Sequence, residues 1–312
     1  MIIAFDTSCY TTSLAIIGQD GTIHQDRRIL LSVKPGERGL RQSDALFQHL
    51  QNLPRLLDQP LPKADFQAVA ASVRPRPVDN SYLPVFTAGS SCGETLAGLL
   101  GVPFIGTSHQ EGHIRAGMFE NDLSGPSLAW HISGGTTELL MVTPGLLGYK
   151  IELIGGSSDL HVGQFVDRVG IALGTGFPAG PVLEKMALTA ENVVKLPVVA
   201  KDLTLSFSGP DSAARRLIET GNTLGAELAR GVFQCIALSL LKVTVTAVTR
   251  YQLNKVLLVG GVASNSIVRD ILQQEGERNG IRFYFGRKEL SSDNAVGVGL
   301  IARDYLAKGS PQ

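Results

Sequence analysis

The sequence has few cysteines and no excess of charge. Its 312 residues include three cysteines, Cys9, Cys92 and Cys235, and none of them belongs to a CxxC pair. A disulfide framework and a cysteine-ligated zinc site are therefore not expected. The 28 lysines and arginines balance the 28 aspartates and glutamates, so no net field draws the protein toward nucleic acid or acidic lipid. Any contact with nucleic acid would be local or made through other subunits.

Segments that would carry the chain to a membrane are also missing. No basic region or cleavage site precedes Asp6. The longest apolar run, residues 235–248, is interrupted by Lys242 and is too short to span a bilayer. We therefore expect a cytoplasmic protein without a membrane partner.

The composition itself is typical of a soluble globular enzyme. Hydrophobic residues make up 44% of the chain and charged residues 18%, and the length permits two domains or one large α/β unit. The 35 glycines indicate several close backbone approaches, which phosphate-binding sites require.

Two histidines with helical spacing are the first candidates for chemistry. Residues 107–118 predict a helix with His109 and His113 one turn apart on one face. Such a pair binds a divalent metal if a third ligand joins it. A zinc-peptidase signature would need glutamate directly after the first histidine, where this chain has Gln110. The alternative is that both are ordinary surface or core histidines.

The N-terminus reads as a strand, a polar turn and a second strand. Residues 2–5 and 12–17 are apolar, and Asp6, Thr7 and Ser8 lie between them. A carboxylate at the end of a buried strand is costly unless it meets a metal or a phosphate-bridging water, or caps its own turn. Asp6 and Ser8 are our candidate catalytic residues.

The same pattern returns after residue 125. Apolar residues 128–132 and 138–142 flank Ser133, Gly134, Gly135, Thr136 and Thr137. The glycines would let backbone amides close on a phosphate, although the turn alone could be a simple hairpin. The repetition suggests a nucleotide held between two related lobes, residues 1–125 and 126–312, with the last helix packing back toward the first lobe.

Further elements follow from local patterns. We expect a helix over 42–57 interrupted at Pro54, and a polar loop over 31–39. Gly260 and Gly261 separate a buried strand, 255–259, from a helix, an arrangement that favours anion or nucleotide binding. Asp293, with its neighbours, is expected to cap a final helix over 295–306.

Several motifs occur in a fixed order along the chain: residues 2–8 with Cys9, HQEGH at 109–113, SGGTTEL at 133–139, GQFVD at 163–167, FPAGP at 177–181, SFSG at 206–209, GGVASN at 260–265 and SDNA at 292–295. Together they resemble one family, the tRNA threonylcarbamoyladenosine transferases of the TsaD group. The resemblance implies an α/β, two-lobed actin-like ATPase fold with duplicated mixed sheets and a central cleft.

The resemblance also implies roles for residues. It makes His109, His113 and Asp293 ligands of one divalent metal, iron or zinc. It assigns nucleotide contacts to the loop 133–137, to the glycines 260 and 261, and to Asp167, Gly180, Glu184 and Asn265. The implied donor is threonylcarbamoyl-AMP, with ATP or ADP and Mg²⁺ as related cofactors. The acceptor would be the N6 amine of a tRNA adenosine, and TsaB-like and TsaE-like subunits or a homologous chain would be partners.

Some loops differ from the family pattern. Tyr10, Thr11 and Thr12 stand where acidic residues are usual, Thr136 replaces a histidine, and Pro210 follows SFSG. The segments 74–84 and 155–164 also differ. We interpret the chain as a divergent paralogue.

Three functions remain open at this stage. The first is a metal-dependent carbamoyl-type transferase. The second is a nucleotide-binding scaffold that pairs with a catalytic homologue. The third is a small-molecule kinase of the same fold, for which Asp211 would be the candidate base.

Overall fold

The computed structural model describes residues 1–8, 10–33, 40–58, 60–121, 123–221 and 223–309. Cys9 and most of the loop expected at 31–39 lie outside these residues. The chain forms two compact units, and each is described by itself. Unit 1 consists of Met1–Phe119, Thr143–Ile151 and Arg287–Gln312, and unit 2 of Glu120–Val142 and Glu152–Gly286. Unit 1 thus differs from the expected first lobe by including the segment 143–151 and the last helix.

Unit 1 is built around a five-stranded sheet in the order β3-β2-β1-β4-β5. Its strands are β1 (Ile2–Asp6), β2 (Thr11–Ile17), β3 (Ile23–Leu30), β4 (Ala68–Arg74) and β5 (Phe104–Ser108). Its helices are α1 (Gln42–Leu57), α2 (Phe86–Leu100), α3 (His109–Gly117), the short η2 (Lys288–Leu290) and α9 (Val296–Ala307). β1 pairs antiparallel with β2 and parallel with β4, so the sheet is mixed.

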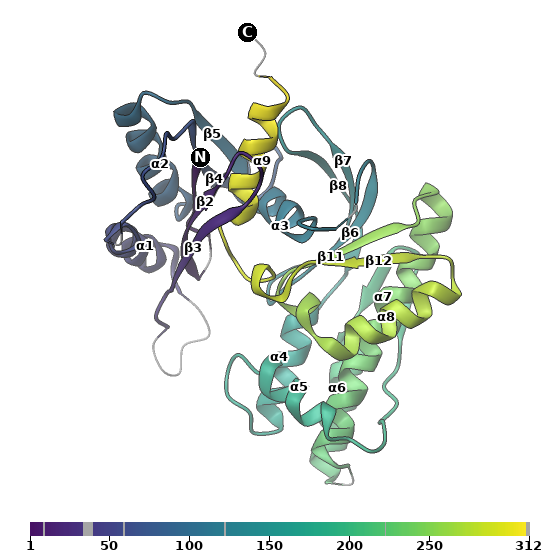
Figure 1. The fold of residues 1–312 in the computed structure, drawn as a ribbon. Helices are drawn as coiled ribbons and strands as arrows, with labels where there is room; N and C mark the ends of the chain where they lie inside the picture. The colour runs from purple at the N-terminus through teal and green to yellow at the C-terminus, as the bar shows by residue number, and fades with distance from the viewer. Residues whose placement is uncertain (9, 34–39, 59, 122, 222, 310–312) are drawn as a thin grey trace. The chain divides into compact units, whose positions relative to one another are not determined.

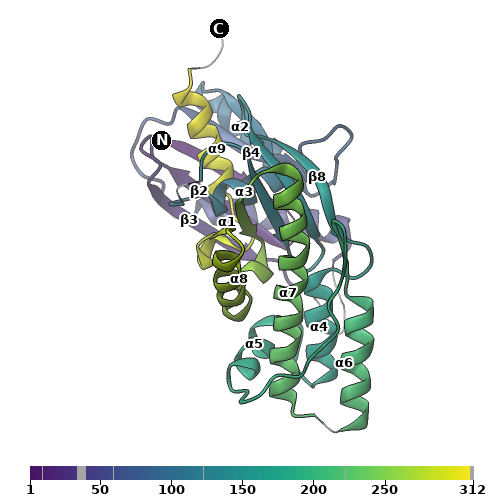
Figure 2. The ribbon, with the colours of Figure 1, turned by 90° about the vertical axis from the view of Figure 1, so that its right-hand side faces the viewer.

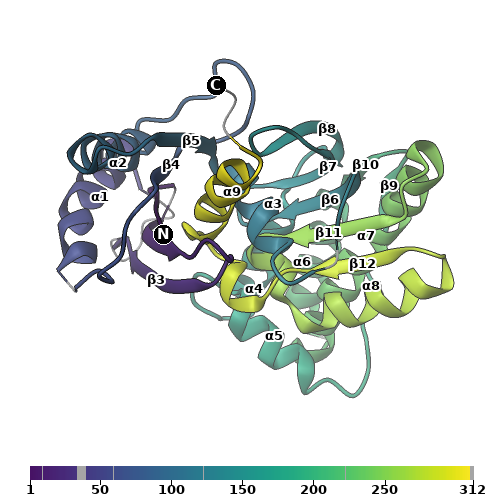
Figure 3. The same ribbon diagram turned by 45° about the horizontal axis from the view of Figure 1, so that its top comes forward.

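Alternate residues of β1 serve two separate cores. Ile2 and Ala4 pack with α9, whereas Ile3 and Phe5 pack with α1 and α2. This follows from the two-residue period of a strand, whose side chains point to opposite faces of the sheet. Helices therefore cover both faces, as Figure 3 shows for α1 and α2 on one side and α9 on the other.

Helix α1 does not stop at Pro54. The helix continues to Leu57 with the proline inside it, so the predicted interruption is wrong. Leu53 and Leu56 on either side of the proline are buried in the core of unit 1. Burial of two leucines contributes about 4 kcal/mol, which offsets the cost of about 3 kcal/mol for a helical proline.

Unit 2 repeats the strand order of unit 1. Its sheet runs β12-β11-β6-β7-β8-β10-β9. The strands are β6 (Ser127–Ile132), β7 (Thr137–Pro144), β8 (Tyr149–Ser157), β9 (Val199–Lys201), β10 (Thr204–Ser206), β11 (Lys255–Val259) and β12 (Arg282–Phe285). In chain order β6, β7, β8, β11 and β12 occupy the places of β1 to β5, with the same antiparallel and parallel partners for the first strand. The predicted duplication is confirmed, and the hairpin β9–β10 extends one edge of the sheet.

Helices α4 to α8 complete unit 2. They are α4 (Val162–Ala172), α5 (Gly180–Leu188), α6 (Ser208–Thr220), α7 (Gly225–Tyr251) and α8 (Ser266–Arg278), with the short η1 (Gly261–Ser264) before α8. Figure 2 shows α7 running beside α4, α5 and α6. By length and composition α7 could cross a membrane, but 61% of its most apolar window is buried. Its apolar residues belong to the core of unit 2, so packing explains the composition.

Candidate metal centre and nucleotide-binding loops

Helix α3 presents the two histidines, and a capping box fixes where it begins. The Ser108 hydroxyl accepts a hydrogen bond from the Glu111 amide, and the Glu111 carboxylate accepts one from the Ser108 amide at 2.9 Å. This reciprocal arrangement satisfies two amides that a helix N-terminus leaves unpaired. With the start fixed at His109, His113 lies one turn further along the same face.

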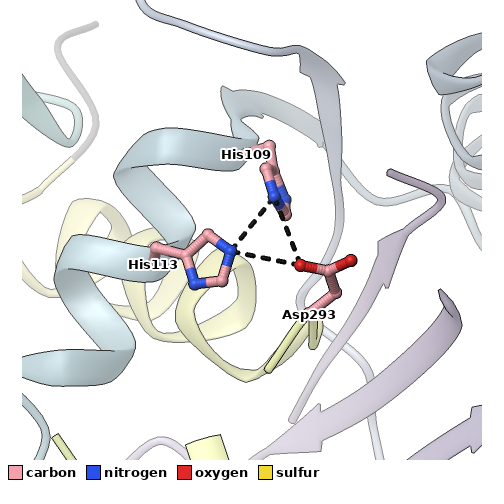
Figure 4. A group of neighbouring side chains, drawn as sticks. All are labelled: His109, His113 and Asp293. Atoms are coloured by element: carbon pink, nitrogen blue, oxygen red, sulfur yellow. Dashed lines mark hydrogen bonds and ion pairs between the residues drawn. The ribbon is translucent and has the colours of Figure 1, made fainter. Parts of the chain in front are cut away.

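Asp293 meets both histidines, as Figure 4 shows. The Nε2 atoms of His109 and His113 are 3.1 Å apart. Asp293 Oδ1 lies 3.6 Å from Nε2 of His109 and 3.3 Å from Nε2 of His113. In the described part of the chain this is the one group of three histidine, cysteine or acidic residues with ligand atoms this close. The carboxylate turns toward the imidazoles, and the predicted capping of α9 is made instead by Asn294, which accepts from the Val296 amide.

The three atoms suit a single divalent ion. A metal with bonds of about 2.1 Å to nitrogen and oxygen holds adjacent ligands about 3.4 Å apart in tetrahedral geometry. The three separations of 3.1, 3.3 and 3.6 Å bracket this value. Two imidazoles and one carboxylate suit zinc or iron and leave coordination positions open.

Asp6 lies behind His109. Its Oδ2 is 2.7 Å from Nδ1 of His109, and its Oδ1 accepts from the Ser8 amide. Burial alone raises the pKa of Asp6, but the His109 ring outweighs burial and lowers it. Burial likewise lowers the pKa of His109, but the Asp6 and Asp293 carboxylates raise it above its usual value. Asp6 therefore holds the proton on Nδ1 and leaves Nε2 facing His113 and Asp293.

Ser8 occupies the same turn but plays no visible part in the triad. Its side chain is fully buried, and its hydroxyl has no hydrogen-bond partner within the described segments. Its amide, donating to Asp6, fixes that carboxylate. A catalytic role for Ser8 stays a prediction.

Glu111 ties α3 to the segment 143–151 of unit 1. It is buried, and one carboxylate oxygen accepts from Thr107 and from the amide and hydroxyl of Ser108. The other oxygen accepts from the Tyr149 amide at 3.0 Å. Gly148 adjoins it with φ +66°, and a Cβ there would overlap the carboxylate. Both carboxylate oxygens of Glu111 therefore accept hydrogen bonds inside the protein. These bonds anchor α3, the helix that carries the two histidines.

Glu111→Gln is expected to destabilise the protein by about 1–3 kcal/mol, because an amide NH₂ would face groups that themselves donate. Chemical denaturation of the two proteins measures this difference. The matched control is Glu94→Gln on α2, an exposed glutamate, which should unfold at the wild-type midpoint. Equal midpoints for Glu111→Gln and wild type would contradict the anchoring role.

A glycine contact sets the distance between α3 and α9. A Cβ on Gly297 would overlap the carbonyl oxygen of Gly112, and a Cβ on Gly112 would lie 3.2 Å from Val298. Gly112 stands between the two histidines, and Gly297 is the second residue of α9, four positions after Asp293. The close crossing of these helices therefore places the third ligand beside the other two.

His49 of α1 lies near the turn that carries Asp6. It is fully buried, and its Nδ1 is 2.9 Å from the Thr12 hydroxyl. Burial lowers the pKa of His49 to about 4, against the opposing influence of the Asp6 and Asp293 carboxylates and the Ser8 backbone. The ring is therefore neutral at physiological pH.

This histidine makes the fold sensitive to acid. Unfolded His49 binds a proton below its ordinary value of 6.5, but folded His49 does so only below about 4. The unfolded state thus holds more protons between these values, and stability falls as the pH falls. From pH 7 to pH 5 the contribution is about 2 kcal/mol. Urea unfolding at both pH values should show a smaller loss for His49→Gln than for wild type; equal losses would contradict the prediction.

In unit 2 the loop 133–137, which the sequence predicts to bind phosphate, joins β6 to β7. The Ser133 amide donates to the Thr136 carbonyl, and Gly134 and Gly135 are exposed with open space around them. The N-terminus of α4 docks on this loop: the Val162 amide donates to Thr137 Oγ1 and the Gly163 amide to the Ser133 carbonyl. Exposed glycine amides beside a helix N-terminus favour an anion.

The second glycine segment follows β11. Gly260 has φ +95°, and a Cβ there would overlap the Ile132 carbonyl at the end of β6. Gly261 is exposed with open space around it. Asn265 caps α8 by accepting from the Val268 amide at 2.9 Å. The segment therefore needs glycine at position 260 to lie against β6, and nucleotide binding by this turn stays a prediction.

The other predicted nucleotide residues bridge helices of unit 2. Asp167 accepts from the Ala179 amide at 2.8 Å, which fixes the residue before Gly180. Glu184 accepts from the amide and hydroxyl of Ser266 and so joins α5 to α8. Burial raises the pKa of Asp167, although the Ala179 hydrogen bond opposes this. These contacts preorganise one surface of unit 2.

Asp211, considered as a kinase base, is committed to ion pairs. It is buried, and its Oδ2 lies 3.2 Å from both Arg168 and Arg215. Both guanidinium groups engage the same carboxylate oxygen, which holds the Asp211 side chain in place.

The sequence interpretation did not single out Glu111 as an anchor, nor His49 or Gly297. Only Glu111 left a local signal, since Ser108 and Glu111 match the S-x-x-E capping pattern.

Comparisons with known proteins point to one family. Residues 39–300 match the family model TsaD, tRNA N6-adenosine threonylcarbamoyltransferase. A tRNA N6-adenosine threonylcarbamoyltransferase from Cyanothece sp. is 30% identical over 331 residues, covering 99% of this chain and 92% of the relative. The enzyme of the same name from Persephonella marina is 29% identical over 309 residues, covering 95% and 88%.

Solved structures agree on the fold. Full-length HypF in its phosphate- and nucleotide-bound form aligns with a TM-score of 0.60 at 15% identity, covering 99% of this chain and 47% of HypF. Component A of (R)-2-hydroxyglutaryl-CoA dehydratase from Acidaminococcus fermentans aligns with a TM-score of 0.58 at 14% identity, covering 98% and 97%. These similarities support the actin-like ATPase and sugar-kinase fold. Because the family model matches residues 39–300, which are most of this chain, the chain belongs to the TsaD family, the tRNA N6-adenosine threonylcarbamoyltransferases.

Proposed function

We propose that this protein transfers a threonylcarbamoyl group from threonylcarbamoyl-AMP to the N6 amine of a tRNA adenosine, with His109, His113 and Asp293 as ligands of a divalent metal. The observation that carries the proposal is the convergence of these three residues within ligating distance of one another, in a chain that belongs to the transferase family. In the reaction N6 bonds to the carbamoyl carbon, the bond from that carbon to the phosphate oxygen breaks, and AMP and one proton leave.

The metal is iron or zinc in this proposal. When bound, it supplies a Lewis acid that polarises the carbamoyl carbonyl and stabilises negative charge on the departing phosphate. His109 is oriented for this role by Asp6, whose carboxylate is 2.7 Å from Nδ1. His113 and Asp293 are oriented by the start of α3 and by the turn before α9. Preorganised ligands of this kind avoid the cost of ordering flexible side chains when the ion binds.

Unit 2 holds the adenylate. The amides of Gly134 and Gly135 are placed to receive phosphate oxygens, and the Asp167 and Glu184 carboxylates suit ribose hydroxyls. Gly260 and Gly261 give the nucleotide access to the end of β11. If ATP or ADP binds at the same loops, Mg²⁺ accompanies the phosphates.

We propose the partners and the location by analogy with the family. Lysines and arginines equal aspartates and glutamates in number, so tRNA is held by local contacts and by partner proteins rather than by a strong overall field. TsaB-like and TsaE-like subunits, or a homologous chain, supply the remaining surface. The protein acts in the cytoplasm, where tRNA and adenylate are available.

The proposal is tested by reconstitution with defined substrates. The full chain, loaded with zinc or iron(II), is mixed with threonylcarbamoyl-AMP, tRNA and the partner subunits, and modified adenosine is measured by mass spectrometry. We expect metal-dependent formation of threonylcarbamoyladenosine in tRNA. Binding of one ADP per chain without metal or turnover would instead identify a scaffold, and ADP release from ATP in the presence of sugars would identify a kinase.

A further inference from the structure

One row of side chains crosses the sheet of unit 1 beside the metal centre. In the strand register Asp6 of β1 lies opposite Ser13 of β2, and Ser13 lies opposite Arg28 of β3. Residues directly opposite one another in a sheet share a face. That face packs against α9, because Ala15, two residues after Ser13, belongs to the core that α9 completes. Arg28 therefore stands on the same face of the sheet as Asp6.

An ion pair with Asp26 fixes the Arg28 side chain. Nε donates to Asp26 Oδ1 at 2.9 Å and Nη2 donates to Oδ2, the two-point geometry in which a guanidinium fits a carboxylate. The Arg28 and Asp26 side chains are 21% and 23% exposed, so the pair by itself adds little to the stability of the fold. Its effect is to set the direction of the remaining nitrogen, Nη1.

Nη1 of Arg28 reaches the segment that carries the third metal ligand. It donates to Ser292 Oγ at 2.9 Å, and Ser292 directly precedes Asp293. Leu290 and Ala295 are buried on either side, but between them Ser292 is exposed and Asp293 is half-buried. The hydrogen bond from Arg28 therefore ties the exposed part of this segment to the sheet.

Asn294 shapes the same segment from within. Its Nδ2 donates to the carbonyls of Leu290 and Ser292 at 3.0 and 2.8 Å, and its Oδ1 accepts from the Val296 amide at 3.0 Å. These bonds join residues of one turn to each other. They leave the orientation of the turn relative to the sheet to Arg28 and to the packing of α9.

We propose that Arg28 is a positioning residue of the metal centre: by donating to Ser292, it holds Asp293 where the carboxylate meets the two histidines. The row on the sheet then serves both sides of the site, with a carboxylate behind one histidine at one end and a guanidinium behind the aspartate at the other. Binding of a substrate anion by Arg28 fits less well, because all three guanidinium nitrogens already donate to protein oxygens. The proposal rests on the proposed metal site.

Zinc affinity in matched variants of the full chain tests this role. Arg28→Met keeps an apolar stem without a donor and Ser292→Ala removes the acceptor, and each should raise the Kd for Zn²⁺ by about fivefold or more. Ser292→Thr retains the hydroxyl and should bind like wild type. Arg28→Met combined with Ser292→Ala should lose no more affinity than Arg28→Met alone, since both changes break one hydrogen bond. The control is Arg278→Met, which removes an exposed arginine paired with Glu275 on α8 and should leave the Kd unchanged.

Stability measured in parallel separates positioning from a purely structural role. Ser292 is exposed, so Ser292→Ala should unfold in urea close to the wild-type midpoint when metal is absent, although its zinc affinity falls. A wild-type Kd for both Arg28→Met and Ser292→Ala would overturn the proposal, whatever their stability.

Crystal structures of the metal-free variants decide the role of Arg28 separately from the metal. In the wild-type chain Asp293 Oδ1 lies 3.3 Å from Nε2 of His113, and this separation should lengthen in Arg28→Met and in Ser292→Ala. An unchanged separation in both variants would overturn the proposal. A wild-type protein that binds no zinc would contradict the proposed function instead, while the crystal structures would still decide whether Arg28 positions Asp293.

Discussion

His113→Ala is expected to lose stoichiometric metal binding and to lower the rate of tRNA modification by at least about 100-fold. The substitution removes one of three ligands and leaves an imidazole and a carboxylate, which do not hold a divalent ion at micromolar concentration. His113 is a better choice than His109, because His109 also pairs with the buried Asp6 and its loss would leave that carboxylate unpaired. The measurements are elemental analysis after dialysis and the reconstituted transfer assay.

The control for this variant is His24→Ala, which removes an exposed histidine of the same unit. It should retain one metal ion per chain and the wild-type rate. Circular dichroism of His113→Ala should remain close to that of the metal-free wild type, since alanine favours the helical conformation of α3. A His113→Ala protein with normal metal content and normal turnover would remove His113 from the site.

Gly297→Ala is expected to destabilise unit 1 by about 3 kcal/mol or more, because its Cβ would overlap the Gly112 carbonyl oxygen. Backbone atoms on both sides make the overlap hard to relieve. The helices α3 and α9 must separate, which moves Asp293 away from the two histidines. We therefore expect weaker metal binding as well as a lower midpoint of urea unfolding.

Gly98→Ala on α2 is the matched control. Both glycines lie inside helices, but Gly98 has no atom within 4 Å of an added Cβ. Alanine is the better helix former, so Gly98→Ala should stabilise the protein by about 0.5–1 kcal/mol. If Gly297→Ala unfolds at the wild-type midpoint, the close helix crossing does not set the ligand distance.

Local patterns in the sequence predict most of unit 1 and unit 2. Apolar runs broken by glycine and polar turns indicate β1, β2, β6 and β7, because a buried strand and a tight turn each have a short-range signature. The repeat of these runs indicates the duplicated sheet. Pro54 shows the limit of such reasoning: a local rule predicts an interruption, but burial of Leu53 and Leu56 in the core of unit 1 keeps α1 intact.

The sequence predicts only some of the residues that build the metal site. The spacing of His109 and His113 is a local signal, and the resemblance to the family supplies Asp293. Neither indicates Gly297 or Arg28, because their roles depend on contacts between elements far apart in the chain. Gly297 is defined by the crossing of α3 and α9, and Arg28 by its hydrogen bond from β3 to the turn before α9.

The positions that depart from the family pattern can be placed within each unit. Tyr10 is 43% exposed beside the turn of Asp6, so this change alters the surface near the metal centre without disturbing the ligands. Thr136 closes the loop through its carbonyl, which leaves its side chain free to vary. Pro210 lies in the first turn of α6, where a missing amide costs no intrahelical hydrogen bond. These three departures therefore lie outside the hydrogen bonds of the metal ligands, whereas Thr11 and Thr12 are buried in β2.

The most direct measurement is an anomalous-difference map, collected at the zinc edge from crystals of the zinc-loaded protein. The account predicts one strong peak per chain, about 2.0–2.2 Å from Nε2 of His109, Nε2 of His113 and a carboxylate oxygen of Asp293. A map in which zinc binds elsewhere, or in which these three side chains turn away from a common point, would contradict it.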